Sequence, residues 1–343
     1  MVRNGLMWMF LIVGTMIGAG YASGREIWEF FGSESGLAIF LFMILFIICS
    51  YVVMHISYKH QSAHYLPVLH ILMGKRISKL YDVMIILYLF TTTVIMLAGG
   101  GATLEVVHFP FWAGVVIVAA FVVVLFIWDT DGITTIHTVI TPILIFALVS
   151  VLFAFQSLHG FPLTFWEEKQ GNWPTALTFT ALNILPLISV LGAIGQKIKG
   201  KGEIVIAAVG SGTILGGLTF LYNSSLIEVA SELVVYEIPL FAILQHYPYY
   251  MVLVMSGILW VAIYTTAASG VFGLISRIRE YIQAPAWVLA LMLVAIMAPL
   301  TMFGFSNLIS FLYPLYGVLN LYLFSSIMLY PILHHKAIRP KIE

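Results

Sequence analysis

The stretch GTMIGAGYASG, from Gly14 to Gly24, decides how this chain is interpreted. It lies inside an apolar segment, residues 5–31, that is long enough to cross a membrane as a helix. Four glycines within eleven residues weaken such a helix, since each costs about 1 kcal/mol relative to alanine. We therefore expect a membrane helix that is interrupted near its midpoint.

The composition is that of a polytopic membrane protein. Of the 343 residues, 61% are hydrophobic and only 9% are charged, and the mean hydropathy is +1.04. The formal net charge of +0 gives no reason to expect a nucleic-acid partner. A single cysteine, Cys49, excludes an internal disulfide and a cysteine-based metal site.

Apolar runs of about 20 residues predict ten membrane spans. Their approximate limits are residues 5–31, 36–58, 77–101, 111–128, 134–157, 174–198, 203–223, 248–277, 285–303 and 305–333. With the N-terminus in the cytoplasm, thirteen of the 15 basic residues fall on the cytoplasmic side. This distribution follows the positive-inside rule. It predicts a protein of the cell's inner (plasma) membrane with both termini in the cytoplasm.

Ten spans divide into two halves of five, and an odd number of spans per half gives the second half inverted topology. The predicted division is a first repeat at residues 1–157, an extracellular linker at 158–173, a second repeat at 174–333 and a cytoplasmic tail at 334–343.

The first span of the second half is also predicted to break. It carries Asn183 and Pro186 near its centre, and a proline removes one backbone donor. Interruptions in the leading helix of each half are a pointer to the binding site of a transporter. The predicted fold is therefore an all-α integral membrane protein with a 5+5 inverted repeat and discontinuous helices 1 and 6.

The Gly14–Gly24 motif resembles helix 1 of the LeuT-fold, or amino acid–polyamine–organocation, transporter superfamily. Within that superfamily the chain resembles the YkvI-like group of amino acid permeases. The resemblance covers the whole chain in span count, orientation and break positions, and its motifs lie in helices 1, 6 and 8. It implies that helices 1 and 6 unwind around the substrate, and that helices 1 and 8 hold a sodium ion. Sodium is then the coupling ion, and no other cofactor is expected.

The resemblance implies a sodium site built from carbonyls and hydroxyls. The carbonyls would come from Gly14, Ile17 and Ala262, and the hydroxyls from Thr265 and Thr266. Positions i, i+3 and i+4 share one helix face, and hard oxygen ligands suit such a cation. The alternative is that the threonines only bond the carbonyls of their own helix.

A second ion site is in doubt, because Tyr21 stands where sodium-coupled relatives often have an asparagine. Proton coupling stays open, with Asp82, His55 and His137 as titratable candidates near the inner ends of the spans.

The predicted substrate site lies at the break in helix 1. Free amides at Gly18, Ala19 and Gly20 would favour a carboxylate. Further candidate contacts from helices 1, 6 and 3 are Tyr21, Phe179, Thr180, Asn183, Thr92 and Met96, with Tyr88 as another wall. Because no acidic residue is expected at this depth, the sequence argues against polyamines. It favours a small neutral amino acid or a related carboxylate.

An outer gate is predicted just beyond the break. Arg25 is the only basic residue deep in a predicted span, and an intramembrane charge indicates function. We expect a gate formed by Arg25, Glu26 and an acidic neighbour, such as Glu237 or a glutamate at the end of a span, with direct substrate contact or snorkelling as alternatives. The segment from Ser225 to Gln245 would pack nearby as an outer lid. Gly24 is expected in the restarted helix, where alanine would be tolerated.

These features favour a secondary active transporter of a small solute, embedded in lipid and without an obligate protein partner. The alternatives are a proton-coupled or uncoupled permease for another small organic solute, and a channel or sensor on the same fold. An enzyme would need a nucleophile–base or metal constellation, which the sequence does not contain.

Overall fold

The computed structural model describes residues 1–128, 131–160, 170–279 and 282–333, with side chains omitted at 128 and 131–139. The described chain is helical, without a strand. The elements are α1 (Val2–Met16), α2 (Ala19–Ala22), α3 (Arg25–Phe30), α4 (Gly36–Lys59), α5 (Tyr65–Val106), α6 (Phe111–Trp128), α7 (Asp131–His159), α8 (Thr175–Ala193), η2 (Gly195–Lys197), α9 (Lys201–Glu228), α10 (Leu240–Leu244), α11 (Tyr249–Ile278), α12 (Ala286–Met297), η3 (Ala298–Phe303), α13 (Phe305–Leu319) and α14 (Leu321–Leu333).

Each predicted span falls on one or more of these helices, although the bounds differ; the span predicted at 77–101 lies within the longer α5. Within the described residues, eight segments are long and apolar enough to cross a membrane, and α1 and most of α6 are shorter apolar helices. All ten predicted spans thus correspond to an apolar helical segment, whereas the 5+5 repeat and its boundaries stay predictions. The tail at 334–343 and most of the linker, 161–169, lie outside the described residues.

Helix 1 leaves helical geometry where its glycines lie. After α1 ends at Met16, Ile17 has φ −83° and ψ 69°, and Gly18 is extended with φ −84° and ψ −177°. The four-residue α2 follows, and Gly24 then takes a left-handed conformation with φ 80° before α3 begins. The outer half of this span is therefore two short helices and not one.

The interruption predicted for helix 6 is not present as an end of the helix. α8 continues through Pro186 to Ala193 and is followed by the short η2. A proline removes only one amide donor, and membrane helices tolerate it where neighbouring groups satisfy the freed carbonyl. The Asn183 amide donates to the Phe179 carbonyl, 2.9 Å away, and so supports the helix that it was expected to break.

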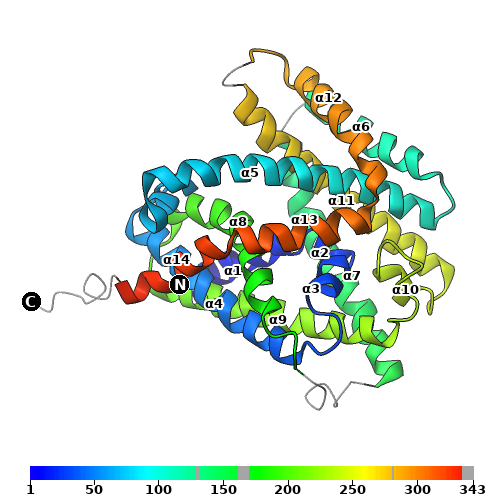
Figure 1. The fold of residues 1–343 in the computed structure, drawn as a ribbon, viewed down its shortest axis with the longest axis horizontal. Helices are drawn as coiled ribbons and strands as arrows, with labels where there is room; N and C mark the ends of the chain where they lie inside the picture. The colour runs from blue at the N-terminus through cyan, green and yellow to red at the C-terminus, as the bar shows by residue number, and fades with distance from the viewer. Residues whose placement is uncertain (129–130, 161–169, 280–281, 334–343) are drawn as a thin grey trace, which may run out of the picture.

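The helices pack into one buried core that places the interrupted helix in the interior. Figure 1 shows α5 and α13 running lengthwise across the molecule, with α2, α3 and α10 toward one end and α14 toward the other. α1 packs against α9 and α8, while α11 packs against α5 and α7. The Gly99–Gly101 stretch permits close helix contact: a Cβ added to Gly114 of α6 would lie 2.6 Å from the Gly100 carbonyl oxygen.

Candidate transport site

The break in helix 1 leaves open space at Gly18. A Cβ added there would meet no heavy atom within 4 Å, although the residues on either side, Ile17 and Ala19, are each 1% exposed. Because α2 has only four residues, the dipole of the restarted helix is weaker than the sequence suggested. What the break offers a ligand is therefore space and polar backbone groups.

Gly20 lies against the carboxyl group of Glu26. A Cβ added to Gly20 would lie 3.0 Å from Glu26 Cδ and 3.2 Å from the Tyr313 hydroxyl oxygen. Glu26 is 9% exposed, and the Tyr313 hydroxyl donates a hydrogen bond to its carboxylate. The expectation that no acidic group lies at the depth of the break is therefore wrong, because the Glu26 side chain folds back onto helix 1.

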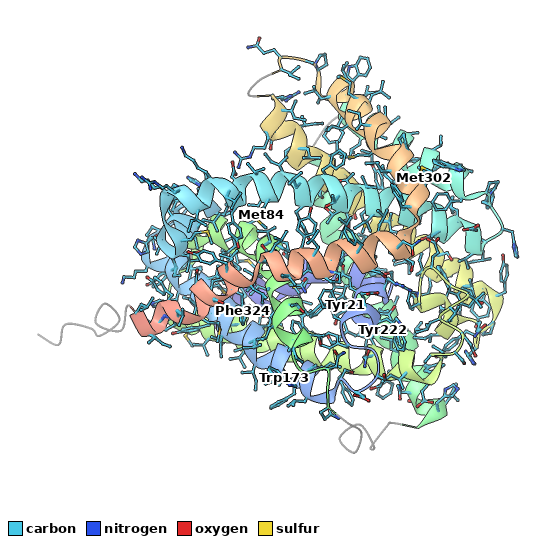
Figure 2. All side chains as sticks on the ribbon, viewed as in Figure 1. Tyr21, Met84, Trp173, Tyr222, Met302 and Phe324 are labelled. Carbon is cyan, nitrogen blue, oxygen red and sulfur yellow. The ribbon has the colours of Figure 1, made fainter. Side chains whose placement is uncertain are left out.

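Tyr21 points away from this carboxyl group and toward α9. Its hydroxyl pairs with the Thr219 hydroxyl at 2.8 Å, and its ring is 1% exposed. The neighbouring Tyr222 donates to the Ala22 carbonyl at 2.8 Å; Figure 2 labels both tyrosines in the interior of the molecule. These bonds attach the restarted helix to α9.

The other predicted substrate residues lie on the packed faces of α8 and α5, two helices that contact one another. Phe179 belongs to an aromatic cluster, with ring centroids 4.8 to 5.1 Å from those of Phe42, Phe31 and Phe30.

Three further candidates on these helices have little exposed surface. Thr180 is 0% and Met96 is 1% exposed, while Asn183 keeps 7%. The Thr92 hydroxyl donates to the Tyr88 carbonyl at 2.6 Å. The candidates come from elements that pack together, and their role in substrate binding stays a prediction.

A carbonyl and two hydroxyls converge on one face of α11. The hydroxyls of Thr265 and Thr266 both donate to the Ala262 carbonyl, at 3.0 and 2.8 Å. Their lone pairs remain as acceptor positions for a cation. This bonding to the helix's own carbonyls matches the alternative that the sequence left open, and it is compatible with ligation.

The predicted helix-1 ligands lie where regular backbone bonding stops. In the described residues, no backbone amide donates to the carbonyl of Gly14 or Ile17 across this break, and α2 packs against α11. Carbonyl groups buried in a membrane protein need a partner. The segment after the break thus contacts the helix that carries Ala262, Thr265 and Thr266, and ligation of a cation by the oxygen atoms of both helices stays a prediction.

The outer cluster pairs Arg25 with a glutamate of its own span, and its role as a gate stays a prediction. The Arg25 guanidinium donates to the Ser310 hydroxyl at 3.2 Å and lies 3.9 Å from the Glu29 carboxylate, to which Ser310 donates at 2.7 Å. Glu237 accepts instead from the backbone amide of Phe305 at 2.9 Å. Glu29 is a glutamate near the end of the first predicted span, one of the two kinds of acidic neighbour expected for Arg25, whereas Ser310 is a residue that the sequence analysis missed.

A groove of about 340 Å³ opens beside this cluster. It is lined by Arg25, Trp28, Leu233, Tyr236, Glu237 and Ser306. The segment expected to be an outer lid forms one wall, and the Leu240 amide fixes its α10 end to the Ser23 carbonyl at 3.0 Å.

Polar contacts also join helices at the predicted cytoplasmic ends of the spans. Arg277 of α11 forms an ion pair with Asp82 of α5 at 2.6 Å, and Tyr65 contacts both residues. Glu203 of α9 accepts from the side chains of Asn4 and Trp8 at 3.0 and 3.3 Å.

Of the titratable candidates named from the sequence, Asp82 is thus paired. The ring of His55 stacks on Tyr51 with centroids 5.9 Å apart, and His137 lies outside the described side chains.

Comparisons with known proteins identify relatives over almost the full chain, although no protein-family model matches it. The chain is 52% identical over 331 residues to YyaD of Bacillus subtilis (strain 168), covering 96% of this chain and 98% of YyaD. It is 24% identical over 323 residues to the membrane protein YkvI of the same organism, covering 91% and 92% of the two chains.

Among solved structures, the manganese transporter of Eremococcus coleocola aligns with 95% of this chain and 75% of its own, with a TM-score of 0.56 and 14% identity. That likeness concerns the fold. Together with the helix arrangement, these relationships confirm the resemblance drawn from the Gly14–Gly24 motif. The chain belongs to the family of YyaD, and it shares the helical fold of that manganese transporter, the LeuT fold that the resemblance implied.

Proposed function

We propose that this protein is a sodium-coupled symporter of a small neutral amino acid or a related carboxylate. The observation that carries the proposal is the convergence of the Ala262 carbonyl with the hydroxyls of Thr265 and Thr266. These atoms lie on α11, which packs against the segment that follows the break in helix 1.

A monovalent cation fits this set of donors. The set contains carbonyl and hydroxyl oxygens and no carboxylate, so it holds a hard cation weakly enough for release in each transport cycle. The carbonyls of Gly14 and Ile17 would complete the coordination. Sodium binding would then draw helix 1 toward α11 and order the break.

The substrate would occupy the space beside Gly18. A methyl group added at Gly18 would meet no atom within 4 Å, so the position beside this residue is open. Unpaired backbone amides at the break would bind its carboxylate. Asn183, which keeps 7% exposure on α8, would contact a second polar group of the substrate.

Access from the outside would be controlled where α3 meets α13. The contacts of Arg25 with Ser310 and Glu29 join these helices beside the outer groove. Opening of this contact would expose the break to the outer solution, and its closure would commit the bound solute to the cycle.

Sodium-dependent thermal stability of the purified protein tests the ion site. Sodium at 100 times its dissociation constant should stabilise the protein by about 2.7 kcal/mol relative to potassium. The double variant Thr265→Val with Thr266→Val should lose this stabilisation. Thr103→Val is the matched control, because Thr103 is a buried threonine that donates to its own i−4 carbonyl at 2.7 Å. Equal sodium stabilisation in all three proteins would refute the site.

Uptake into proteoliposomes tests the transport class. A symporter should accumulate substrate against its gradient only when a sodium gradient is imposed. A channel would equilibrate the solute without accumulation. Among solutes selected by thermal shift, the amide of a transported acid should compete poorly, and competition at the potency of the free acid would exclude carboxylate recognition.

A further inference from the structure

Glu26 is a buried carboxyl group that the sodium and substrate sites do not use. It belongs to the six-residue α3, and 9% of its surface is exposed. Its Cδ atom would lie 3.0 Å from a Cβ on Gly20, so the carboxyl group packs directly against helix 1. In a membrane protein such a group is a candidate for function.

The ionisable groups around Glu26 are tyrosines. Tyr313 of α13 donates to the carboxylate, and Tyr88 of α5 and Tyr21 of α2 lie within electrostatic range of it. Of the other elements against α3, α9 contributes Tyr222 beside Gly24, and α8 carries no titratable side chain.

No cation balances Glu26 within the described residues. The two ion pairs found there are Arg25 with Glu29 and Arg277 with Asp82. Arg25 precedes Glu26 in α3, but its guanidinium contacts Ser310 and Glu29. Since an unpaired buried carboxylate is strongly disfavoured, Glu26 must be neutral or must receive a cation in this closed arrangement.

A proton fits the site better than a larger cation. Glu26 is enclosed between Gly20 and Tyr313, where even an added methyl group would have to displace its neighbours. A proton occupies no additional volume, whereas a substrate ammonium group would need space at the carboxyl oxygens.

The position of Glu26 connects its charge to the outer contact. Ser310 and Tyr313 lie three residues apart on α13 and therefore share a face. Ser310 binds Arg25 and Glu29, while Tyr313 binds Glu26. The α3–α13 contact thus contains one charged pair beside the groove and one buried carboxyl group beneath it.

We infer that Glu26 is a proton-binding site, and that its protonated form keeps α3 closed on α13. The inference rests on the proposed function in taking this contact as the outer gate. When the proton leaves a Glu26 oxygen for water, the remaining carboxylate requires hydration. Arg25, the residue before Glu26, lines a groove together with Glu237, and water from this groove would hydrate the carboxylate. Deprotonation therefore favours separation of α3 from α13, and proton uptake favours closure.

Cysteine labelling as a function of pH tests this inference. In a Cys49→Ala background, which removes the only cysteine, Asn183→Cys reports access to the interior. Val234→Cys, at a residue that is 91% exposed, reports the intrinsic pH dependence of the reagent. A membrane-impermeant maleimide is added on the side of the membrane that Val234 faces, and the ratio of the two labelling rates is measured from pH 6 to pH 9.

The ratio should rise with pH in the parent protein. Because one proton separates the closed from the open form, the open fraction can rise by up to about tenfold per pH unit. Glu26→Gln should give a low and pH-independent ratio, since the amide imitates the neutral acid. Glu29→Gln is the matched control on α3 and should keep the pH dependence. A flat ratio in the parent protein, or an equal rise in Glu26→Gln, would overturn the inference.

Tyr313→Phe gives a second test that does not require the Glu26 variant to fold. Tyr313 lies on α13 and binds Glu26 in the closed arrangement, a contact that is lost when α3 separates from α13. Its loss removes a contact of the closed form only and should move the opening transition to lower pH, and a shift to higher pH would overturn the inference. If neither sodium nor any solute stabilises the protein, but the labelling ratio depends on pH and Glu26→Gln abolishes that dependence, the proposed symport is refuted and the proton site is supported. Flat labelling with intact sodium stabilisation refutes only the proton site.

Discussion

Alanine substitutions at Gly18 and Gly20 separate a binding role from a packing role within one turn of chain. In Gly20→Ala, the new Cβ would lie 3.0 Å from Glu26 Cδ, 3.2 Å from the Tyr313 hydroxyl oxygen, and closer still to a Glu26 carboxyl oxygen. Glu26 and Tyr313 are both buried. The glutamate side chain must therefore move away from helix 1.

Two opposing effects determine how much Gly20→Ala changes the free energy of unfolding. Overpacking a buried site costs about 1–3 kcal/mol. Alanine in place of glycine within a helix stabilises the helix by about 1 kcal/mol. Gly20→Ala should therefore lower the free energy of unfolding by about 0–2 kcal/mol.

Gly18→Ala should act in the opposite direction on stability. Gly18 has φ −84°, which alanine adopts without strain, and a Cβ there meets nothing within 4 Å. Reduced freedom of the unfolded chain should stabilise this variant by about 0.4–1 kcal/mol. Its uptake per folded molecule should nevertheless fall, because the methyl group occupies the proposed substrate space.

The assay measures melting by fluorescence-detected size exclusion, without sodium or solute, together with uptake per folded molecule. We expect Gly20→Ala to melt at a lower temperature than Gly18→Ala, and Gly18→Ala to have the weaker substrate-induced stabilisation. If Gly20→Ala is as stable as Gly18→Ala, the contact with Glu26 does not exist as described. If Gly18→Ala transports normally, the substrate does not use that space.

Three further predictions concern other parts of the molecule. Gly24→Ala should destabilise the protein by about 1–2 kcal/mol from the left-handed backbone alone. Adding Tyr222→Phe should not restore stability, because a Cβ on residue 24 would also lie 2.8 Å from the Tyr222 ring carbon Cζ. An unchanged melting temperature in Gly24→Ala would contradict this prediction. Thr265→Val with Thr266→Val should abolish the difference in melting temperature between sodium and potassium, and a retained difference would argue against this ion site. Asp82→Asn should lower the free energy of unfolding by about 1–2 kcal/mol, since it removes the ion pair with Arg277, whose two side chains are each 30% exposed. The same melting assay measures this loss, and an unchanged melting temperature would mean that the ion pair does not stabilise the fold.

The local features of the chain could be predicted because they depend on local physics. Hydropathy defines apolar segments, and the positions of all ten predicted spans correspond to helices. Glycine content disfavours a helix, and the backbone indeed leaves helical geometry at Ile17 and Gly18. Pro186 shows the limit of this reasoning: a single lost donor did not outweigh the packing of α8, and the helix continues through it.

The direction of individual side chains could not be predicted in the same way. Arg25 and Glu26 are adjacent, and the sequence analysis placed both in one gate. In α3 they point to different neighbours, because consecutive helical residues are about 100° apart. The left-handed backbone of Gly24 sets the orientation of this six-residue helix. The hydropathy of the sequence does not indicate that Gly24 takes this conformation. The Arg25–Glu29 pair did have a signal, since their i, i+4 spacing favours an ion pair.

The glycines that follow α1 are best explained by three separate requirements. A packing explanation accounts for Gly20, whose missing side chain makes room for a carboxyl group, but it cannot account for Gly18, which would contact nothing if it had a Cβ. Gly24 is required by its φ of 80°, because the alternative residues would pay a conformational penalty at that turn. A helix that needed only close packing would show glycines on one face, each against a neighbour. The open position beside a buried carboxyl group and a fixed turn is instead the arrangement expected where a chain must bind a solute and move one short helix.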